Sequence, residues 1–485
     1  MSMVLHALKC HALERPDKEA IVGDGIQLTY RELISEVRQA TNVITERRCK
    51  VLSLALDNGP AWAIWDLAAQ QAGVTLVPLP GFFTPEQALH TLSDAGVEAV
   101  IHQDGGPEDP HVAGQACQWR TLEPRSSGRI PPGTAKITYT SGTTGRPKGV
   151  CLSQPAIDRV VRSLAEAVQS CPDDRHLALL PLSILLENIG GLYIPLFAGA
   201  TAILEPMSRM GVSGSSQLAA ETMLEALRDY RATTAIMVPA QLDGLVTALE
   251  SGLISPPDLR FLAVGGGAVA PRLLKRADAI GLPVFQGYGL SECASVVAVN
   301  RPGEEAFTGV GRPLCHADVK IAEDGEVQVH APGFLGYLNG ELPTGEWWPT
   351  GDLGYLDARG ALHLTGRKKS IFITAFGRNV APEWVEAELT AEPEIVQAAV
   401  FGEARPWNSA VVVSPASASS IAQAVSRANQ RLPDYASIHR WLRADAPFST
   451  NNGMATANGH PRREAIFAAY RSPLDSLYEN QEVTP

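Results

Sequence analysis

Short apolar runs that alternate with longer helical stretches restrict the fold of this chain more than any other feature. Val51–Leu56, Val74–Leu79 and Phe261–Val264 have the length and apolar character of buried strands, and Pro60–Ala72 separates the first two with a helical pattern. The same rhythm recurs at Val97–His102, Ala178–Leu180, Ala200–Leu204 and Ala235–Val238. Strands separated by helices predict an α/β fold of parallel sheets with right-handed crossovers. Open sheets of this kind bind ligands at the carboxyl ends of their strands.

The pattern changes beyond about residue 305 and again near Lys369. Between these points we expect short, turn-rich strands such as Glu326–His330. From Lys369 onward we expect a smaller α+β unit, with a helix at Pro382–Leu389, a strand at Ser409–Val413 and a loop at Ser414–Ser420. A chain of 485 residues has room for several domains, so this division is consistent with its length.

Charge and cysteine usage argue against several classes of partner. Lys+Arg total 40 and Asp+Glu 52, and the net charge of −12 disfavours binding to nucleic acid or to an anionic membrane surface. The seven cysteines include no CxxC pair, which favours a reduced, cytoplasmic location. Leu177–Leu204 carries a single charge, Glu187, but Pro181 and Pro195 interrupt it. We therefore expect a buried strand–helix–strand there and no integral membrane segment.

A loop rich in glycine and hydroxyl side chains follows an apolar strand end in Ile137–Val150, which reads ITYTSGTTGRPKGV. Glycines let successive backbone N–H groups point into one concavity, which binds anions. Lys148 adds a cation suited to phosphate, and further donors come from the hydroxyls of Thr140, Ser141, Thr143 and Thr144. The spacing is not that of a Walker A motif. By composition alone a plain surface loop remains an alternative.

Five further segments follow this loop. They are Gln286–Glu292 (QGYGLSE), Thr350–Leu353 (TGDL), Gly366–Lys369 (GRKK), Leu432–Tyr435 (LPDY) and Thr456–Arg463 (TANGHPRR). In this order, over roughly residues 15–470, the set resembles the motifs of the adenylate-forming superfamily of acyl- and aryl-CoA synthetases, luciferases and peptide-synthetase adenylation domains. One such match is weak evidence, whereas several in family order are specific.

The resemblance implies a fold and an activity. It implies a large N-terminal domain of parallel α/β sheets plus a small β-barrel subdomain, over residues 1–368, and a small mobile α+β C-terminal domain, over residues 369–485, with a hinge near Lys369. The activity it implies joins a carboxylate to the α-phosphate of ATP, with release of pyrophosphate. The acyl group then passes to a thiol.

The resemblance also assigns roles around the phosphates. It places the β- and γ-phosphates of ATP on the loop residues Thr140, Ser141, Gly142, Thr143 and Thr144 together with Lys148. Glu292, aided by Thr140, is the expected Mg²⁺ ligand, because a carboxylate is a hard oxygen donor. Ser291 is expected to bind the α-phosphate. Lys148, Glu292 and His460 are the residues expected to be catalytic.

The same resemblance assigns the nucleoside. Gly266, Gly267 and Ala268 are expected to form a wall for adenine opposite Tyr288, although a simple strand-to-helix turn is the alternative. The nucleotide-binding set is completed by Gln286, Gly287 and Gly289. Asp352 is expected to accept hydrogen bonds from the ribose hydroxyls, and Arg367 to donate to the same sugar. A solvated charge run is the alternative for Arg367 and its neighbour Lys369.

One position departs from the family. In the family's C-terminal motif a lysine bridges the carboxylate and the α-phosphate, and here that residue is His460. A free histidine is mostly neutral near pH 7, whereas lysine is charged. Three interpretations follow: His460 acts as a protonated substitute, Arg462 or Arg463 takes over, or adenylation is weak and the chain is a binding relative.

The acid is expected to be hydrophobic. Leu180–Glu187 reads LPLSILLE and is similar to a stretch of long-chain fatty-acyl-CoA synthetases, which favours a medium- or long-chain fatty acid. The residues expected to line the acyl pocket are Glu187, Gly190, Gly191, Val238 and Val264, with ordinary core as an equal alternative. CoA is the expected acceptor. Loading of an acyl or peptidyl carrier protein through its phosphopantetheine arm, β-lactone synthesis and a homodimer stay open.

Overall fold

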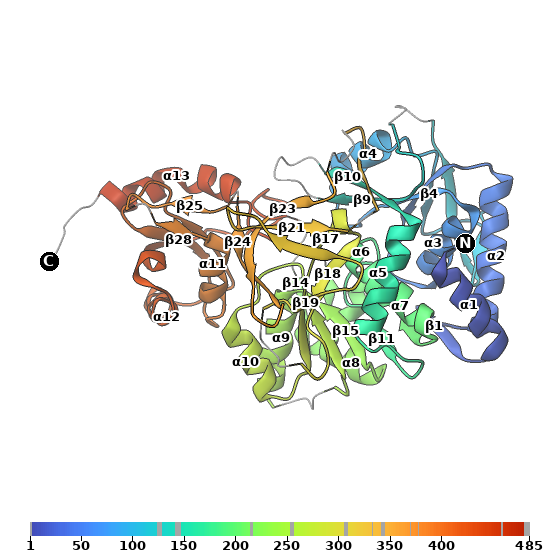
Figure 1. The fold of residues 1–485 in the computed structure, drawn as a ribbon, viewed down its shortest axis with the longest axis horizontal. Helices are drawn as coiled ribbons and strands as arrows, with labels where there is room; N and C mark the ends of the chain where they lie inside the picture. The colour runs from blue at the N-terminus through green and yellow to red at the C-terminus, as the bar shows by residue number, and fades with distance from the viewer. Residues whose placement is uncertain are drawn as a thin grey trace. The chain divides into compact units, whose positions relative to one another are not determined.

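The computed structural model describes residues 2–123, 129–140, 147–213, 217–252, 257–304, 309–331, 333–340, 345–368, 370–376, 378–456 and 459–479. The chain divides into two compact units (Figure 1). The first comprises Met1–Gly265, Ala277–Val319 and Val329–Trp348, and the second comprises Gly266–Arg276, Lys320–Gln328 and Pro349–Pro485. Lys369, the predicted hinge, lies outside the described residues, and the predicted boundary at 368/369 stays a prediction.

The first unit contains a mixed sheet of nine strands in the described part of the chain, in the order β19-β18-β17-β16-β15-β11-β12-β1-β2. Their bounds are β1 Glu19–Gly23, β2 Ile26–Thr29, β11 Arg175–Leu177, β12 Thr201–Ile203, β15 Thr234–Met237, β16 Phe261–Val264, β17 Val284–Leu290, β18 Ser295–Val299 and β19 Arg312–Pro313. The central strands are parallel, and β2, β18 and β19 are antiparallel at the edges. The predicted α/β architecture is confirmed.

A second sheet of the first unit has seven described strands in the order β22-β10-β9-β4-β3-β5-β8. Their bounds are β3 Val51–Ala55, β4 Thr75–Pro78, β5 Ala99–His102, β8 Gln118–Thr121, β9 Thr134–Thr140, β10 Lys148–Ser153 and β22 Phe334–Tyr337. The helix α3, Pro60–Ala72, packs against β3 and β4. It begins with proline at its first position and ends at Gly73, whose φ of +69° suits a left-handed cap.

The remaining α-helices of the first unit lie on these sheets, with α2 packed on α3 (Figure 1). They are α1 Met3–Glu14, α2 Tyr30–Glu46, α4 Pro85–Asp94, α5 Gln154–Ala167, α8 Ala220–Asp229 and α9 Pro239–Glu250, while α10 Pro271–Ala279 runs across the division between the units. Two short hairpins pair β6 His111–Val112 with β7 Gln115–Ala116 and β13 Val212–Ser213 with β14 Gln217–Leu218. The N-terminus of α2 is closed by a capping box between Thr29 and Glu32.

A buried lysine anchors the strand that leads into the phosphate loop. Lys136, on β9, is 2% exposed, and its Nζ atom donates to Asp66 Oδ1 on α3 at 2.7 Å and to the hydroxyl of Tyr193 at 2.7 Å. It also donates to Asn188. Burial lowers the pKa of Lys136, and the charge of Asp66 opposes this. Because every partner is buried, the network ties β9 firmly to two helical segments.

The apolar stretch Leu177–Leu204 is buried inside the first unit, as predicted. It holds α6 (Leu185–Glu187), the π-helix η1 (Asn188–Tyr193) and α7 (Ile194–Ala198) between β11 and β12. The predicted strand Ala178–Leu180 is wrong, because β11 ends at Leu177 and the N–H of Leu180 donates to the Glu187 carboxylate instead of to a strand. Among the described residues, no helix combines the length and the apolar character needed to cross a membrane.

The turn-rich region forms a four-stranded sheet in the order β20-β21-β23-β24, and the described residues show no closed barrel. Its strands are β20 Asp318–Ile321, β21 Glu326–His330, β23 Trp348–Leu356 and β24 Leu362–Arg367. β22, which lies between β21 and β23 in the chain, joins the seven-stranded sheet.

The C-terminal part of the second unit, orange and red in Figure 1, is a three-stranded sheet with helices on both faces. Its elements are β27 Gln397–Phe401, β28 Asn408–Val413, β29 Ile438–Arg443, α11 Pro382–Thr390, α12 Ala418–Asn429 and α13 Arg463–Glu479, with a small hairpin of β25 Phe372–Ile373 and β26 Asn379–Val380. The loop predicted at Ser414–Ser420 is too long, because Ser417 caps α12 and the helix begins at Ala418.

Candidate active site

The two ends of the phosphate loop lie side by side on neighbouring strands. β9 and β10 are antiparallel, and their register sets Thr140 opposite Lys148. The side chain of Lys148 is exposed, whereas Gly149 beside it is tightly packed, since an added Cβ would lie 2.9 Å from Ile137 Cγ2. The loop residues Ser141, Gly142, Thr143 and Thr144 lie outside the described residues. The hairpin therefore fixes Thr140 and Lys148, the described residues nearest the loop on its two strands.

Glu292 lies close to this hairpin. It belongs to the short 3₁₀ turn η3, Ser291–Cys293, which directly follows β17 and packs against β10 and β22. The hydroxyl of Tyr337, the last residue of β22, donates to Glu292 Oε1 at 2.6 Å. The Nζ atom of Lys148 lies 5.7 Å from the centroid of the Tyr337 ring. Thus one tyrosine contacts both the predicted phosphate cation and the predicted magnesium ligand.

The donor set around Glu292 fits Mg²⁺ that is bound largely by water and phosphate. Within the described residues there is no group of three or more His, Cys, Asp or Glu side chains that could hold a metal ion. Mg²⁺ commonly uses only one or two carboxylates and completes its octahedron with water and substrate phosphates. A single carboxylate next to the predicted anion-binding hairpin is consistent with that mode.

The QGYG residues lie on β17, and the structure gives several of them packing roles. Gln286 Nε2 donates to the carbonyl of Gly309 at 3.0 Å, and Tyr288 is 8% exposed. Gly289 is required by the sheet, because a Cβ there would lie 1.8 Å from the Ser295 carbonyl oxygen. Gly287 is less constrained, with its nearest neighbour at 3.5 Å. The role of this strand in nucleotide binding stays a prediction.

In the second unit, Asp352 and Arg367 stand opposite each other on β23 and β24. Arg367 Nε lies 2.9 Å from Asp352 Oδ1, and the carboxylate side is 9% exposed while the arginine is 63% exposed. The neighbouring turn is held by Glu326, whose Oε1 accepts from the Gly351 N–H at 2.9 Å. The predicted ribose acceptor is therefore rigidly placed and already neutralised.

The predicted adenine wall and His460 both belong to this second unit. Gly266, Gly267 and Ala268 are exposed, so the backbone there is open to a flat ligand. His460 Nε2 lies 2.7 Å from the Gly266 carbonyl oxygen, which makes the ring nitrogen the donor. His460 has an exposed side chain, yet the protein atoms packed near it lower its pKa by displacing part of the surrounding water. A neutral imidazole is thus favoured near pH 7.

Arg463, one of the two suggested replacements for the missing lysine, is already engaged. It pairs with Glu383 at 3.0 Å and with Glu386, whose carboxylate is buried. These ion pairs tie the start of α13 to α11. Arg462 donates its backbone N–H to the Met454 carbonyl. Its side chain is half-buried, and its role as a substitute cation stays a prediction.

The predicted acyl-pocket residues have structural explanations. Glu187 is fully buried, with Oε1 3.0 Å from His176 Nε2. Burial raises the pKa of Glu187, and the hydrogen bond with His176 opposes this. A Cβ at Gly191 would lie 2.0 Å from Glu187 Oε1, and one at Gly190 would lie 2.4 Å from Ile236 Cδ1. Both glycines therefore make room for protein atoms.

The two valines of the predicted acyl pocket differ in burial. Val264 is buried and Val238 is half-buried. A substrate role for the whole predicted set stays a prediction.

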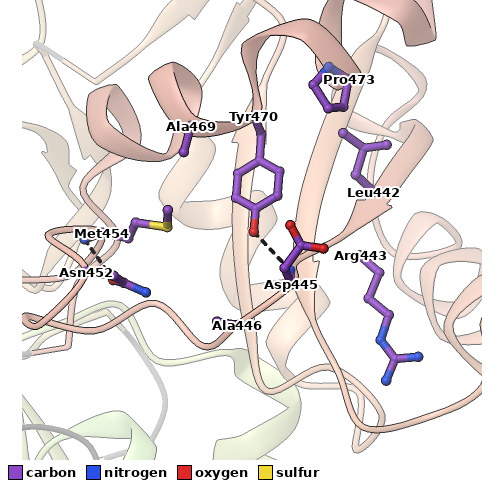
Figure 2. A pocket seen from close by; sticks show the side chains of 9 residues that line it. All are labelled: Leu442, Arg443, Asp445, Ala446, Asn452, Met454, Ala469, Tyr470 and Pro473. Atoms are coloured by element: carbon purple, nitrogen blue, oxygen red, sulfur yellow. Dashed lines mark hydrogen bonds between the residues drawn. The ribbon is translucent and has the colours of Figure 1, made fainter.

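A separate pocket of about 430 Å³ lies in the second unit and contains none of the predicted site residues. Figure 2 shows Leu442, Arg443 and Asp445 across from Tyr470, whose hydroxyl accepts from the Asp445 N–H at 2.9 Å. Helix α13 is kinked at Tyr470 and carries Pro473 on the same wall. The predicted chemistry does not use this pocket.

The comparisons with known proteins identify the family. The AMP-binding enzyme family matches residues 8–339, and the AMP-binding enzyme C-terminal domain matches residues 369–482. The chain belongs to the AMP-binding enzyme family. A 2-succinylbenzoate–CoA ligase of Bacillus licheniformis is 28% identical over 81% of this chain and 86% of its own. A long-chain-fatty-acid–CoA ligase of Mycobacterium bovis is 24% identical over 96% of each.

The fold of this AMP-binding enzyme is similar to that of a ligase whose structure has been solved. An anthranilate CoA ligase in complex with anthranoyl-AMP has a TM-score of 0.82 and 19% identity over 98% of each chain. The predicted membership of the adenylate-forming, acid–thiol ligase class is confirmed. The predicted fatty acid is not singled out, because relatives that are named for 2-succinylbenzoate stand beside relatives that are named for long-chain fatty acids.

Tyr337 and Lys136 are the residues that sequence reasoning missed. Tyr337 reaches Glu292 only because β22 pairs with β10, across a long separation in the chain. Lys136 reads as an ordinary charged residue within an apolar strand, and a buried partner for it, Asp66, lies on a distant helix. A lysine inside an otherwise buried strand was the one available signal for the second case.

Proposed function

We propose that this chain uses ATP and Mg²⁺ to convert a hydrophobic carboxylic acid to its acyl-adenylate and then passes the acyl group to the thiol of CoA. The observation that carries the proposal is the β9–β10 hairpin, which sets Thr140 opposite Lys148 with Glu292 close by. This arrangement offers a cation for phosphate and a carboxylate for a divalent ion at one place. Membership of the AMP-binding enzyme family supports the same use of ATP.

The reaction is written in two steps. A carboxylate oxygen attacks the α-phosphorus of ATP. The bond from the α-phosphorus to the oxygen that bridges to the β-phosphate breaks, and pyrophosphate leaves with the electron pair of that bond. The thiol of CoA then loses its proton to solvent and its sulfur attacks the acyl carbonyl, while the bond from that carbon to the phosphate oxygen breaks and AMP leaves. In the first step Lys148 stabilises charge on the departing phosphates, and Glu292 would hold Mg²⁺, which would supply further charge neutralisation.

The second unit is proposed to recognise the nucleoside. Asp352 accepts hydrogen bonds from the ribose hydroxyls, and the exposed backbone at Gly266 and Gly267 offers a flat surface to adenine. Because Arg367 already neutralises Asp352, the carboxylate can bind a neutral sugar without an additional cation. Rotation of the C-terminal domain about Lys369 between the two steps is part of the proposal.

Two classes of acid are candidates. The LPLSILLE stretch and the fatty-acid ligase that aligns with almost the whole chain favour a medium- or long-chain fatty acid. Side-chain atoms of Ile236 occupy the space beside Gly190, and those of Glu187 occupy the space beside Gly191. This favours a compact acid, such as the aryl acid for which the Bacillus licheniformis relative is named. Transfer to a carrier protein, β-lactone formation, a cytoplasmic location and a homodimer remain predictions.

The experiment that tests the function is ATP–pyrophosphate exchange with a panel of acids. Straight-chain acids of graded length and aryl acids are compared, and CoA is then added to look for the thioester by mass spectrometry. We expect acid-dependent exchange and CoA-dependent thioester formation. A folded protein that binds ATP and shows no exchange with any acid contradicts the proposal and favours a binding relative. Exchange without a CoA thioester would point to a carrier protein or a β-lactone product.

A further inference from the structure

Tyr337 is a side chain to which neither the sequence motifs nor the family match assigns a role. It lies at the end of β22, opposite Val150 of β10, so its backbone is fixed by the sheet that carries Lys148. Its ring packs edge-on against Phe334 at 5.3 Å and Trp348 at 6.0 Å. Two aromatic neighbours and a sheet register therefore hold the ring in one orientation.

The hydroxyl of this fixed ring points at the predicted magnesium ligand. It donates to Glu292 Oε1 at 2.6 Å, a short distance typical of a hydrogen bond to a carboxylate. The hydroxyl keeps its proton at neutral pH and remains a donor.

We propose that Tyr337 is a positioning residue that orients the Glu292 carboxylate toward the divalent cation that accompanies ATP. Glu292 lies in a short 3₁₀ turn, where a glutamate side chain has several rotamers. The hydrogen bond at Oε1 selects one of them and leaves Oε2 to face the cation. Removal of a residue that orients a metal ligand commonly lowers metal affinity by about ten- to hundredfold.

The same ring borders Lys148, which explains why a tyrosine suits this place. An ammonium group 5.7 Å from the ring centroid is weakly attracted by the ring face and stays hydrated. A carboxylate in place of Tyr337 would pair with Lys148 and compete with phosphate, and a lysine would pair with Glu292. A neutral donor orients Glu292 without neutralising either charge. The inference rests on the proposed function, since it concerns the same nucleotide and cation.

The test uses the full chain and an ATP analogue whose α,β-bridge is carbon or nitrogen, because the α,β-bridge is the bond that adenylation would break. Its affinity is measured by calorimetry with saturating Mg²⁺ and again with EDTA, so that the readout is binding and not turnover. Tyr337→Phe keeps the ring and removes only the hydroxyl. We expect the strengthening of binding by Mg²⁺ to fall about tenfold in Tyr337→Phe, with binding in EDTA unchanged. Tyr355→Phe, at a tyrosine that is 51% exposed, is the matched control and should behave as the wild type.

A double-mutant cycle with Glu292→Gln separates orientation from a general structural effect. If Tyr337 acts through Glu292, Tyr337→Phe adds no further loss in the Glu292→Gln protein. Equal weakening with Mg²⁺ and with EDTA, or an undiminished effect in the Glu292→Gln background, overturns the inference. If the wild type binds the analogue and Mg²⁺ strengthens binding equally in the wild type and in Tyr337→Phe, the inference is overturned and the proposed function is not. A wild-type protein that binds no analogue at all overturns the proposed function as well.

Discussion

The two units treat their predicted site charges in opposite ways. In the first unit, Lys148 and Glu292 approach the ring and the hydroxyl of Tyr337, and within the described residues neither forms an ion pair. In the second unit, Asp352 is paired with Arg367 at 2.9 Å. Among the described residues, the first region therefore presents charges that have no ion-pair partner, and the second presents a charge that is already balanced.

This difference matches the chemistry of the two halves of a nucleotide. A triphosphate carries several negative charges, so a side chain that binds it must supply charge that the protein has not already neutralised. Ribose hydroxyls are neutral, and they need only an acceptor in a fixed place. The Arg367 guanidinium offsets part of the cost of burying the Asp352 carboxylate. Mutations in the two regions should consequently have different effects on kcat and KM.

The largest effect is expected for Lys148→Ala. Removing the cation leaves the charge on the departing pyrophosphate without its protein counterpart, so adenylate formation should slow by on the order of 100- to 1,000-fold. ATP–pyrophosphate exchange at saturating ATP and acid measures this as a fall in kcat. Lys50→Ala, which removes another exposed lysine of the first unit, is the matched control. An undiminished exchange rate for Lys148→Ala would refute the proposed role of the hairpin.

A smaller effect, and one on binding, is expected for Asp352→Ala. Losing the acceptor should raise the KM for ATP by about ten- to hundredfold, the value of a hydrogen bond to a charged group. The diagnostic comparison is ATP against 2′-deoxy-ATP. The wild type should discriminate between them, and Asp352→Ala should discriminate much less, because the group that senses the hydroxyl is gone.

The control for this second prediction comes from the same sheet. Asp318 lies on β20 with a side chain that is 79% exposed, so Asp318→Ala removes a carboxylate of the four-stranded sheet without touching the Asp352–Arg367 pair. It should leave the discrimination intact. If Asp352→Ala lowers kcat and leaves KM for both nucleotides unchanged, Asp352 does not recognise ribose, and the contrast between the two regions fails.

Local signals account for the parts that the sequence predicted well. The observed bounds of α3 match the predicted Pro60–Ala72, because a proline opens the helix and Gly73 closes it, and both act within one turn. β16 likewise coincides with Phe261–Val264, an apolar run with turn residues after it. The apolar strand end expected at the start of Ile137–Val150 is also found, in β9, because it too is a local apolar pattern.

Side-chain partners from distant segments account for the parts that the sequence could not predict. The strand near Ala178 ends early because the carboxylate of Glu187 captures the Leu180 N–H, which no strand periodicity encodes. The contact between Tyr337 and Glu292 depends on the pairing of β22 with β10. Long-range pairing has no short-range pattern in a single sequence, so such residues become visible only in the structure.

The smallest expected effect, and the only gain, concerns His460. This residue donates to the Gly266 carbonyl, and its surroundings lower its pKa, so at neutral pH it brings a hydrogen bond and no charge. A lysine there would add a cation for the carboxylate and the α-phosphate. We expect His460→Lys to speed adenylate formation about tenfold, as measured by pyrophosphate exchange. His460→Gln keeps a neutral donor and should bring no gain.

Arg462 decides how this last result is to be interpreted. If Arg462 already supplies the charge that His460 lacks, Arg462→Gln should slow exchange and His460→Lys should add little to the wild type. If neither residue supplies it, Arg462→Gln should be nearly silent and His460→Lys should give the full gain. Arg463 is a poor alternative because Glu383 and Glu386 already hold it, so Arg463→Gln should lower stability through the loss of the α11–α13 ion pairs. A His460→Lys enzyme that is no faster, in a chain where Arg462→Gln is silent, would mean that adenylation here needs no cation at this position.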